Sequence, residues 1–171
     1  MELKKTEITK LCSFYVSDWH LVTMLLPYIS KKVNEEAKIA TILEKDLKQN
    51  IVTLVEKLNL KNKEEILNLN WNKNERIKNI LNELNEKQEF IIFINGSKEF
   101  IERQNIKLEK YFQTHLIKNK IKIINCYEIT KYEGNVSKIL DEHDKILNTS
   151  GEKEIEEIFP EYKVQEKKKV V

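Results

Sequence analysis

The sequence is poor in arginine, cysteine, glycine and proline. Its 171 residues include two arginines, two cysteines, three glycines and two prolines, and the net charge is only +2. Bidentate recognition of phosphate and guanine favours arginine, so this composition argues against a nucleic-acid partner. No stretch rich in glycine, proline or serine divides the chain. We therefore expect one α/β domain over residues 1–160, followed by a charged, mobile tail over residues 161–171.

Long apolar runs are absent as well, and the longest falls far short of the roughly 20 residues that a membrane helix needs. The opening residues, MELKKTEITK, hold no apolar segment after their lysines, so we expect no signal peptide and a cytoplasmic location. Apolar residues make up 40% of the chain and charged residues 34%, which is ordinary for a globular protein. Cys12 and Cys126 fall in apolar segments, where we expect small buried hydrophobes rather than a disulfide or a metal pair.

Apolar strands alternate with amphipathic helices along the chain. Buried strands are predicted at residues 10–16, 37–45, 89–96 and 120–129. Helices are predicted at residues 19–34, 47–60, 74–87, 98–118 and 134–147, with shorter helices or turns at 63–69 and 153–159. This alternation implies βαβ units. It predicts a three-layer, Rossmann-like α/β fold with a mostly parallel central sheet of four or more strands flanked by helices.

Candidate binding residues follow the predicted strands, because ligands of open parallel sheets bind beyond the carboxyl ends of the strands. Four strand ends carry polar or aromatic residues: Ser17-Asp18-Trp19-His20, Glu44-Lys45-Asp46, Asn95-Gly96-Ser97, and Tyr127-Glu128 with the loop through Tyr132 to Gly134. Two interpretations stay open for them. They either line a functional pocket or serve as ordinary helix caps and solvated turns, with Ser17 or Asp18 capping one helix and Ser97 another.

The junction after the first strand, VSDWH, lacks the glycines and the lysine with which phosphate loops hold a nucleotide. NGSKEF, after the third strand, offers one glycine and a helix start, so an anion site there is a weaker alternative. His20 is the best candidate for a general base, with Asp18 to orient it. A surface or packing role for this histidine is the competing interpretation.

No pair of histidines has the spacing of a zinc site, so we expect neither a metal nor a cofactor. The segment DEHDK, residues 141–145, is a candidate acid cluster. We interpret it instead as the solvated face of the predicted helix 134–147.

Two long segments carry a family resemblance. LCSFYVSDWHLVTMLLPYISKKVNEEAKIATILEK ends a strand in Phe14-Tyr15 and continues as a helix through Leu25-Leu26-Pro27. LEKYFQTHLIKNKIKIINCYEITKYEGNVSKILDEHDKIL contains Tyr127-Glu128, Tyr132 with Gly134, and Leu140 with His143. In these features the chain resembles MEDS domains, the sensory domains of methanogen and methylotroph regulators, over roughly residues 10–160.

Departures from the family pattern occur at four places. Lys10 replaces a histidine, Gly96-Ser97 replaces a Gly-Glu pair, Asp144 replaces a proline, and the turn Asn34-Glu35-Glu36 lacks its glycine. The resemblance implies a degenerate relative of the RecA/KaiC-type ATPase core that has lost the Walker glycines and lysine. It also implies that the first, third and fourth strands lie near one another.

These observations predict a non-catalytic sensory or signalling module. It would bind a small-molecule ligand or a regulatory protein partner at the carboxyl edge of the sheet, without nucleic acid or membrane, and act in trans or as a homodimer. The expected pocket rim is Ser17, Asp18, Trp19, His20, Gly96, Ser97, Tyr127 and Glu128. Two alternatives stay open. One is a divergent nucleotide-binding or hydrolytic enzyme with Asp18, His20 and Glu128 as its catalytic set; the other is a regulatory or inhibitory protein without a ligand.

Overall fold

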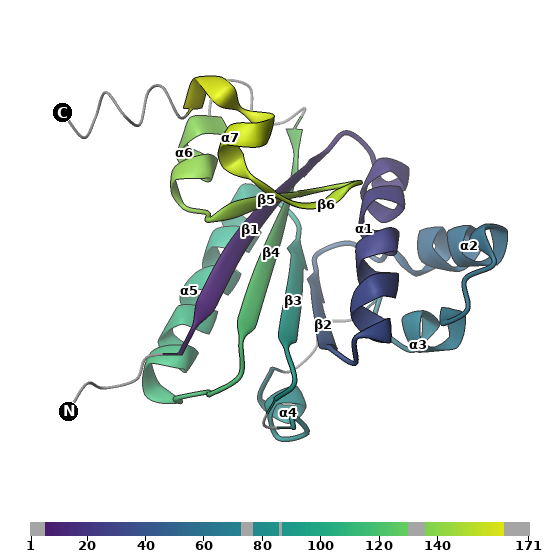
Figure 1. Ribbon diagram of the computed structural model, residues 1–171, viewed down its shortest axis with the longest axis horizontal. Helices are drawn as coiled ribbons and strands as arrows, with labels where there is room; N and C mark the ends of the chain where they lie inside the picture. Colours follow the sequence, from purple (N-terminus) through teal and green to yellow (C-terminus); the bar gives the residue numbers. More distant parts are fainter. Residues whose placement is uncertain (1–5, 73–76, 86, 130–135, 163–171) are drawn as a thin grey trace.

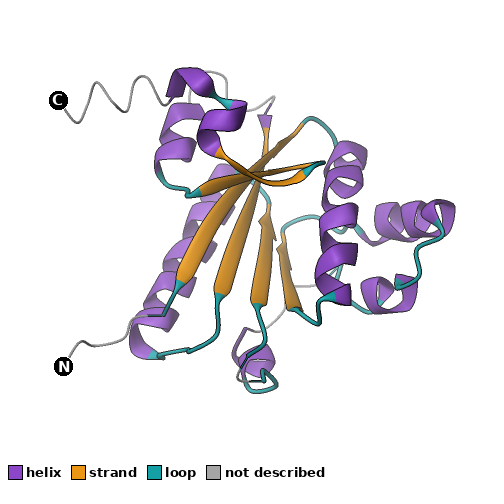
Figure 2. Ribbon diagram, in the orientation of Figure 1, coloured by secondary structure: helices purple, strands orange, loops and turns teal. Residues whose placement is uncertain are grey.

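A mostly parallel β-sheet runs through the centre of the protein, with helices on both faces (Figures 1 and 2). The computed structural model describes residues 6–72, 77–85, 87–129 and 136–162. Over these residues the strands are β1 (Ile8–Tyr15), β2 (Lys38–Leu43), β3 (Phe90–Asn95), β4 (Ile121–Glu128), β5 (Lys145–Asn148) and β6 (Gly151–Glu154). Their order is β2-β3-β4-β1-β5-β6, and only β6 is antiparallel to its neighbour. The predicted three-layer α/β fold is confirmed.

The strands β3, β4 and β1 lie side by side, as expected for the third, fourth and first strands. β1 pairs with β4 along its whole length, from Ile8 opposite Ile121 to Tyr15 opposite Glu128. β3 pairs with the other side of β4 and ends at Asn95. The carboxyl ends of these strands therefore meet at one edge of the sheet, where the candidate residues were expected.

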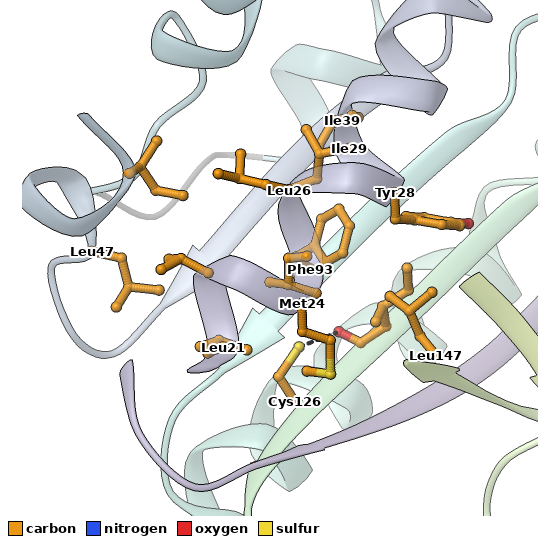
Figure 3. Packing of buried hydrophobic residues seen from close by; sticks show 14 of the residues in the cluster. Leu21, Met24, Leu26, Tyr28, Ile29, Ile39, Leu47, Phe93, Cys126 and Leu147 are labelled. Atoms are coloured by element: carbon orange, nitrogen blue, oxygen red, sulfur yellow. Dashed lines mark hydrogen bonds between the residues drawn. The ribbon is translucent and has the colours of Figure 1, made fainter. Parts of the chain in front are cut away.

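One face of the sheet is covered by α1 (Asp18–Asn34), with α2 (Lys48–Leu58) and α3 (Lys63–Leu67) packed against it. The apolar residues of α1 recur every three or four positions, and this stripe is buried against the sheet. Leu21 and Met24 of α1 lie near Phe93 of β3 and Cys126 of β4 (Figure 3).

The opposite face carries α4 (Ile77–Leu81), α5 (Lys98–Thr114), α6 (Val136–Asp141) and α7 (Ile155–Ile158). Cys12 belongs to this side of the core and Cys126 to the other. Cys12 pairs with Asn125, so Cys126 is one residue further along β4 and points to the opposite face. Both cysteines are free and buried, which confirms that they are small core residues.

The predicted helix 134–147 is wrong in its second half. The described helical part is Val136–Asp141, and Lys145–Asn148 instead forms β5 beside β1. The Asp144 N–H donates to the carbonyl of Lys10 over 2.7 Å, and the Asp144 carboxylate accepts the Lys10 N–H over 2.9 Å. The free edge of β1 thus offers backbone partners that outweigh local helix propensity.

Other predicted boundaries also change. The predicted segment 153–159 begins in β6, and its helix is limited to Ile155–Ile158. Within the described part of the predicted helix 74–87, only Ile77–Leu81 is α-helical. The segment 141–145 is not the solvated face of one helix, because it ends α6 at Asp141, turns, and enters β5 at Lys145, and the His143 side chain in the turn is buried.

Near the C-terminus, Tyr162 packs against the core on the α5 side, and its hydroxyl donates to the Asp141 carboxylate over 2.6 Å. Residues 163–171 of the expected tail lie outside the described residues, as do Tyr132 and Gly134. Among the helices that the structure describes, none has both the length and the apolar character needed to cross a bilayer.

Candidate functional site

The junction between β1 and α1 caps its own backbone. The Ser17 hydroxyl accepts the His20 N–H over 3.1 Å, which confirms Ser17 as the N-cap of α1. The His20 ring nitrogen Nδ1 accepts the Val16 N–H over 3.0 Å. Backbone N–H groups at such a junction hold the phosphate in nucleotide-binding proteins. Here two of them are already bonded to side chains of the same turn.

The start of α5 is closed in a similar way. The Ser97 hydroxyl accepts the Phe100 N–H over 3.1 Å, which confirms Ser97 as the N-cap. The Ser97 N–H donates to the Glu44 carboxylate over 2.9 Å. A carboxylate from the end of β2 therefore takes the position that an external anion would occupy at this helix start. This contact argues against the anion site that NGSKEF left open.

Gly96 lies at the end of β3, where the backbone passes close to Phe100 and Glu44. A Cβ at this position would lie 2.6 Å from Cδ1 of Phe100 and 2.8 Å from Cβ of Glu44. Both distances are shorter than carbon atoms tolerate, so the absence of a side chain lets the end of β3 fit between Glu44 and α5. The glycine therefore has a packing role in the described structure.

Replacing Gly96 with alanine should lower the free energy of unfolding by about 1–3 kcal/mol, because the methyl group overpacks the turn. Urea denaturation of the variant and the wild type measures the change. The same substitution in a Phe100→Leu background should cost less, since the closest clash is with the phenyl ring. A Gly96→Ala variant as stable as the wild type would contradict this account.

Exposed apolar groups stand at the same edge. The side chain of Trp19, in the first turn of α1, is 50% exposed, and that of Val16 is 54% exposed. Beside them the Asp18 carboxylate lies 3.9 Å from the Lys45 ammonium, which links the ends of β1 and β2. The edge therefore presents an indole and an isopropyl group to solvent, next to an exposed ion pair.

Below this surface a buried amide ties three strand ends together. The Asn95 amide donates to the Tyr15 hydroxyl over 2.7 Å and to the Cys126 carbonyl over 3.1 Å. Burial raises the pKa of Tyr15 to about 12, so its hydroxyl stays protonated at neutral pH. The Asn95 Oδ1 atom is buried and has no hydrogen-bond donor among the described residues. Sequence patterns gave no sign of this link, because it depends on the order of the strands.

Tyr127 lies apart from the other predicted rim residues. Its ring is buried on the α5 side, 6.1 Å from the Phe14 ring centroid and edge-on to His143 at 5.8 Å. Glu128 is half-buried and ends β4 opposite Tyr15. The predicted rim residues therefore lie in separate places. Some lie at the starts of α1 and α5, Glu128 lies at the end of β4, and Tyr127 lies on the face of the sheet that α5 covers.

A hollow of about 650 Å³ lies between α5 and the strands β1 and β4, and Tyr127 is part of its wall. Two buried asparagines, Asn105 of α5 and Asn125 of β4, form its polar floor. Neither asparagine was predicted from the sequence as a site residue. The available signal was an amide inside the otherwise apolar run KIKIINCYEI.

The floor asparagines belong to a closed hydrogen-bond network. The Asn105 amide donates to Asn125 Oδ1 over 2.9 Å, and the Asn125 amide donates back over 3.3 Å. The Asn125 amide also donates to Nε2 of His143 over 2.9 Å, while His143 Nδ1–H donates to the Ile139 carbonyl over 2.5 Å. Burial lowers the pKa of His143 to about 4, so the ring is neutral at pH 7.

Three buried ionisable side chains, Cys12, Cys126 and His143, are uncharged at neutral pH. Burial raises the pKa of Cys12 to about 12 and raises that of Cys126 as well, so neither thiol is ionised at neutral pH. Both ring nitrogens of His143 are occupied by the network. Among the residues that the structure describes, no three His, Cys, Asp or Glu side chains gather closely enough to hold a metal ion.

Comparison of this chain with protein-family models, with curated proteins and with solved structures yields no match. Its function must therefore be inferred from the geometry of the sheet edge and of the hollow.

Proposed function

We propose that this protein is a non-catalytic signalling module that docks a regulatory protein partner at the carboxyl edge of its sheet. The observation that carries the proposal is the β1–α1 junction. Its backbone is capped by its own side chains while the Trp19 indole stays half exposed. This junction presents an aromatic side chain at the place where α/β proteins bind their ligands.

Tryptophan is strongly enriched among the residues that dominate protein–protein affinity. Trp19 has the setting of such a residue, since Val16 of the same junction is also exposed and the Asp18–Lys45 pair supplies neighbouring charged groups. The resemblance to MEDS sensory domains supports the same conclusion, because it implies a nucleotide core whose phosphate loop has been lost.

Site-specific photocrosslinking tests the docking surface. A photoreactive phenylalanine analogue replaces Trp19 in cells that produce the protein, and the matched control carries it at Leu58, which is 48% exposed on α2. We expect a discrete cross-linked partner from position 19 and none from position 58. Adducts of equal yield at both positions, or none at position 19, would overturn the proposal.

Trp19→Ala should weaken binding of the cross-linked partner at least tenfold, or about 1.4 kcal/mol, while the melting temperature stays unchanged. Isothermal titration calorimetry measures the affinity of the wild type and of the variant, and acrylamide quenching of tryptophan fluorescence is a second readout for the wild type. Trp71 is 1% exposed and donates to the Ile66 carbonyl over 2.8 Å, so Trp19 accounts for the quenchable emission. Bound partner should protect it. An unchanged affinity of the variant would contradict docking at this residue.

A thermal-shift measurement with ATP and Mg²⁺ separates the module from the enzyme alternative. Since the N–H groups of Val16 and Ser97 are already bonded, we expect no rise in melting temperature. A rise of several degrees would favour a nucleotide-binding enzyme over the proposed module.

A further inference from the structure

We propose that the hollow between α5 and the strands β1 and β4 binds a small organic cation that carries a primary ammonium group. This site lies on a face of the sheet, away from the docking surface at Trp19, and does not depend on that surface. The inference follows from which hydrogen-bonding positions on the floor are already filled, from the charges at the rim and from the shape of the walls.

The amide N–H groups of the floor are all used within the protein. The Asn105 amide donates to the Ile101 carbonyl over 2.8 Å and to Asn125 Oδ1. The Asn125 amide donates to Asn105 Oδ1 and to His143 Nε2. Each amide oxygen accepts one of these bonds and has a second lone pair. A ligand that hydrogen-bonds to these amides must therefore be a donor.

The charged side chains at the rim of the hollow also favour a positively charged ligand. Glu102 and Glu109 are two helical turns apart on α5, so they lie on one face of it, and Glu142 faces them from the turn after α6. Among the described residues that line the hollow, Lys10 is the one basic residue, and its ammonium lies 3.6 Å from the Glu109 carboxylate. One lysine and three glutamates give this described lining a net negative charge, which attracts cations and repels anions.

The walls limit the size and character of the ligand. Ile101 and Ile106 contribute aliphatic surface, and Tyr127 contributes a buried aromatic ring. A volume of about 650 Å³ falls within the range of small-molecule sites. The ligand is thus an ammonium group on a short apolar body.

Binding of n-butylammonium to the full chain tests this inference, with n-butanol and butyrate as probes of the same length but without the positive charge. We expect n-butylammonium to shift the NMR signals of the Ile101 and Ile106 methyl groups and to leave those of Ile51 and Ile66, on the other side of the sheet, unchanged. Neither of the other probes should do so. Equal shifts from butyrate or n-butanol, or no shifts with n-butylammonium, would overturn the inference.

Charge-neutralising variants provide the second measurement. Glu102→Gln with Glu142→Gln should weaken n-butylammonium binding at least fivefold without loss of stability, because both side chains are exposed. The matched control is Glu56→Gln with Glu65→Gln, two exposed glutamates on α2 and α3. The control should bind like the wild type. An equal loss in both would show a general effect of net charge and refute a site in the hollow.

Discussion

Replacing Asn125 with leucine should lower the free energy of unfolding by about 3 kcal/mol, although leucine is more apolar and of similar size. Asn125 is 1% exposed in a strand of isoleucines, where a leucine would be expected to fit. The loss of stability arises because buried polar groups that bond to Asn125 would be left without a hydrogen-bond partner. An Asn105 N–H, the Asn105 oxygen and His143 Nε2 would each lose a bond in the interior. Urea denaturation at pH 7 measures the change.

Two further variants distinguish the loss of these hydrogen bonds from the effect of an asparagine-to-leucine replacement as such. Asn79→Leu, at an exposed position of α4, should change stability by less than about 0.5 kcal/mol. The double variant Asn105→Leu/Asn125→Leu should lose less stability than the sum of the two single variants, because each removes the partner that the other leaves unpaired. An Asn125→Leu variant as stable as the wild type would contradict the role assigned to the network.

The strand at residues 89–96 and the helix caps were predictable because their signals are local. EFIIFING is apolar throughout, which is typical of a strand covered on both faces, and it forms β3. Ser17 and Ser97 each stand between a strand and an amphipathic helix, where a hydroxyl caps the first turn. These features depend on residues within a few positions of one another.

The strand β5 was mistaken for helix because its pattern is ambiguous. KILN has two adjacent apolar residues, Ile146 and Leu147, which a buried strand places on opposite faces and a helix places on one stripe. Only four residues long, the segment carries no periodicity of its own. The free edge of β1 decides its conformation, and that edge is more than 130 positions away in the sequence.

The candidate site was predictable in part. The sheet edge and the position of Trp19 at it were predicted from the sequence. The hydrogen bond from the Ser97 N–H to the Glu44 carboxylate at the start of α5 could not be predicted, because it requires β2 to lie beside β3. The hollow was missed for a similar reason. Asn105, Asn125 and His143 come from a helix, a strand and a turn, and asparagine is so abundant in this chain that two of them carry little signal.

Acid should destabilise the protein through His143. Burial lowers the pKa of this ring from 6.5 to about 4, and the neighbouring Lys10 ammonium acts in the same direction, while the Ile139 carbonyl and the Asp144 carboxylate oppose it. Above pH 6.5 the ring is neutral in both the folded and the unfolded chain. Between pH 6.5 and 4 only the unfolded chain takes up the proton. Stability is therefore lost as the pH falls through this window, by about 3 kcal/mol in total from this one group.

His143→Gln removes this titration, so unfolding of the variant should take up about one proton fewer between pH 6.5 and 4. Its unfolding free energy, measured by urea denaturation at several pH values, should then fall less steeply than that of the wild type, even if the variant is less stable at pH 7. The matched control is His115→Gln, since His115 is exposed and stacks on Tyr111 at the end of α5. The control should keep the wild-type slope. An equal slope in His143→Gln would mean that the ring is protonated in the folded protein, in which case Nε2 could not accept the Asn125 amide and the floor of the hollow would be arranged differently.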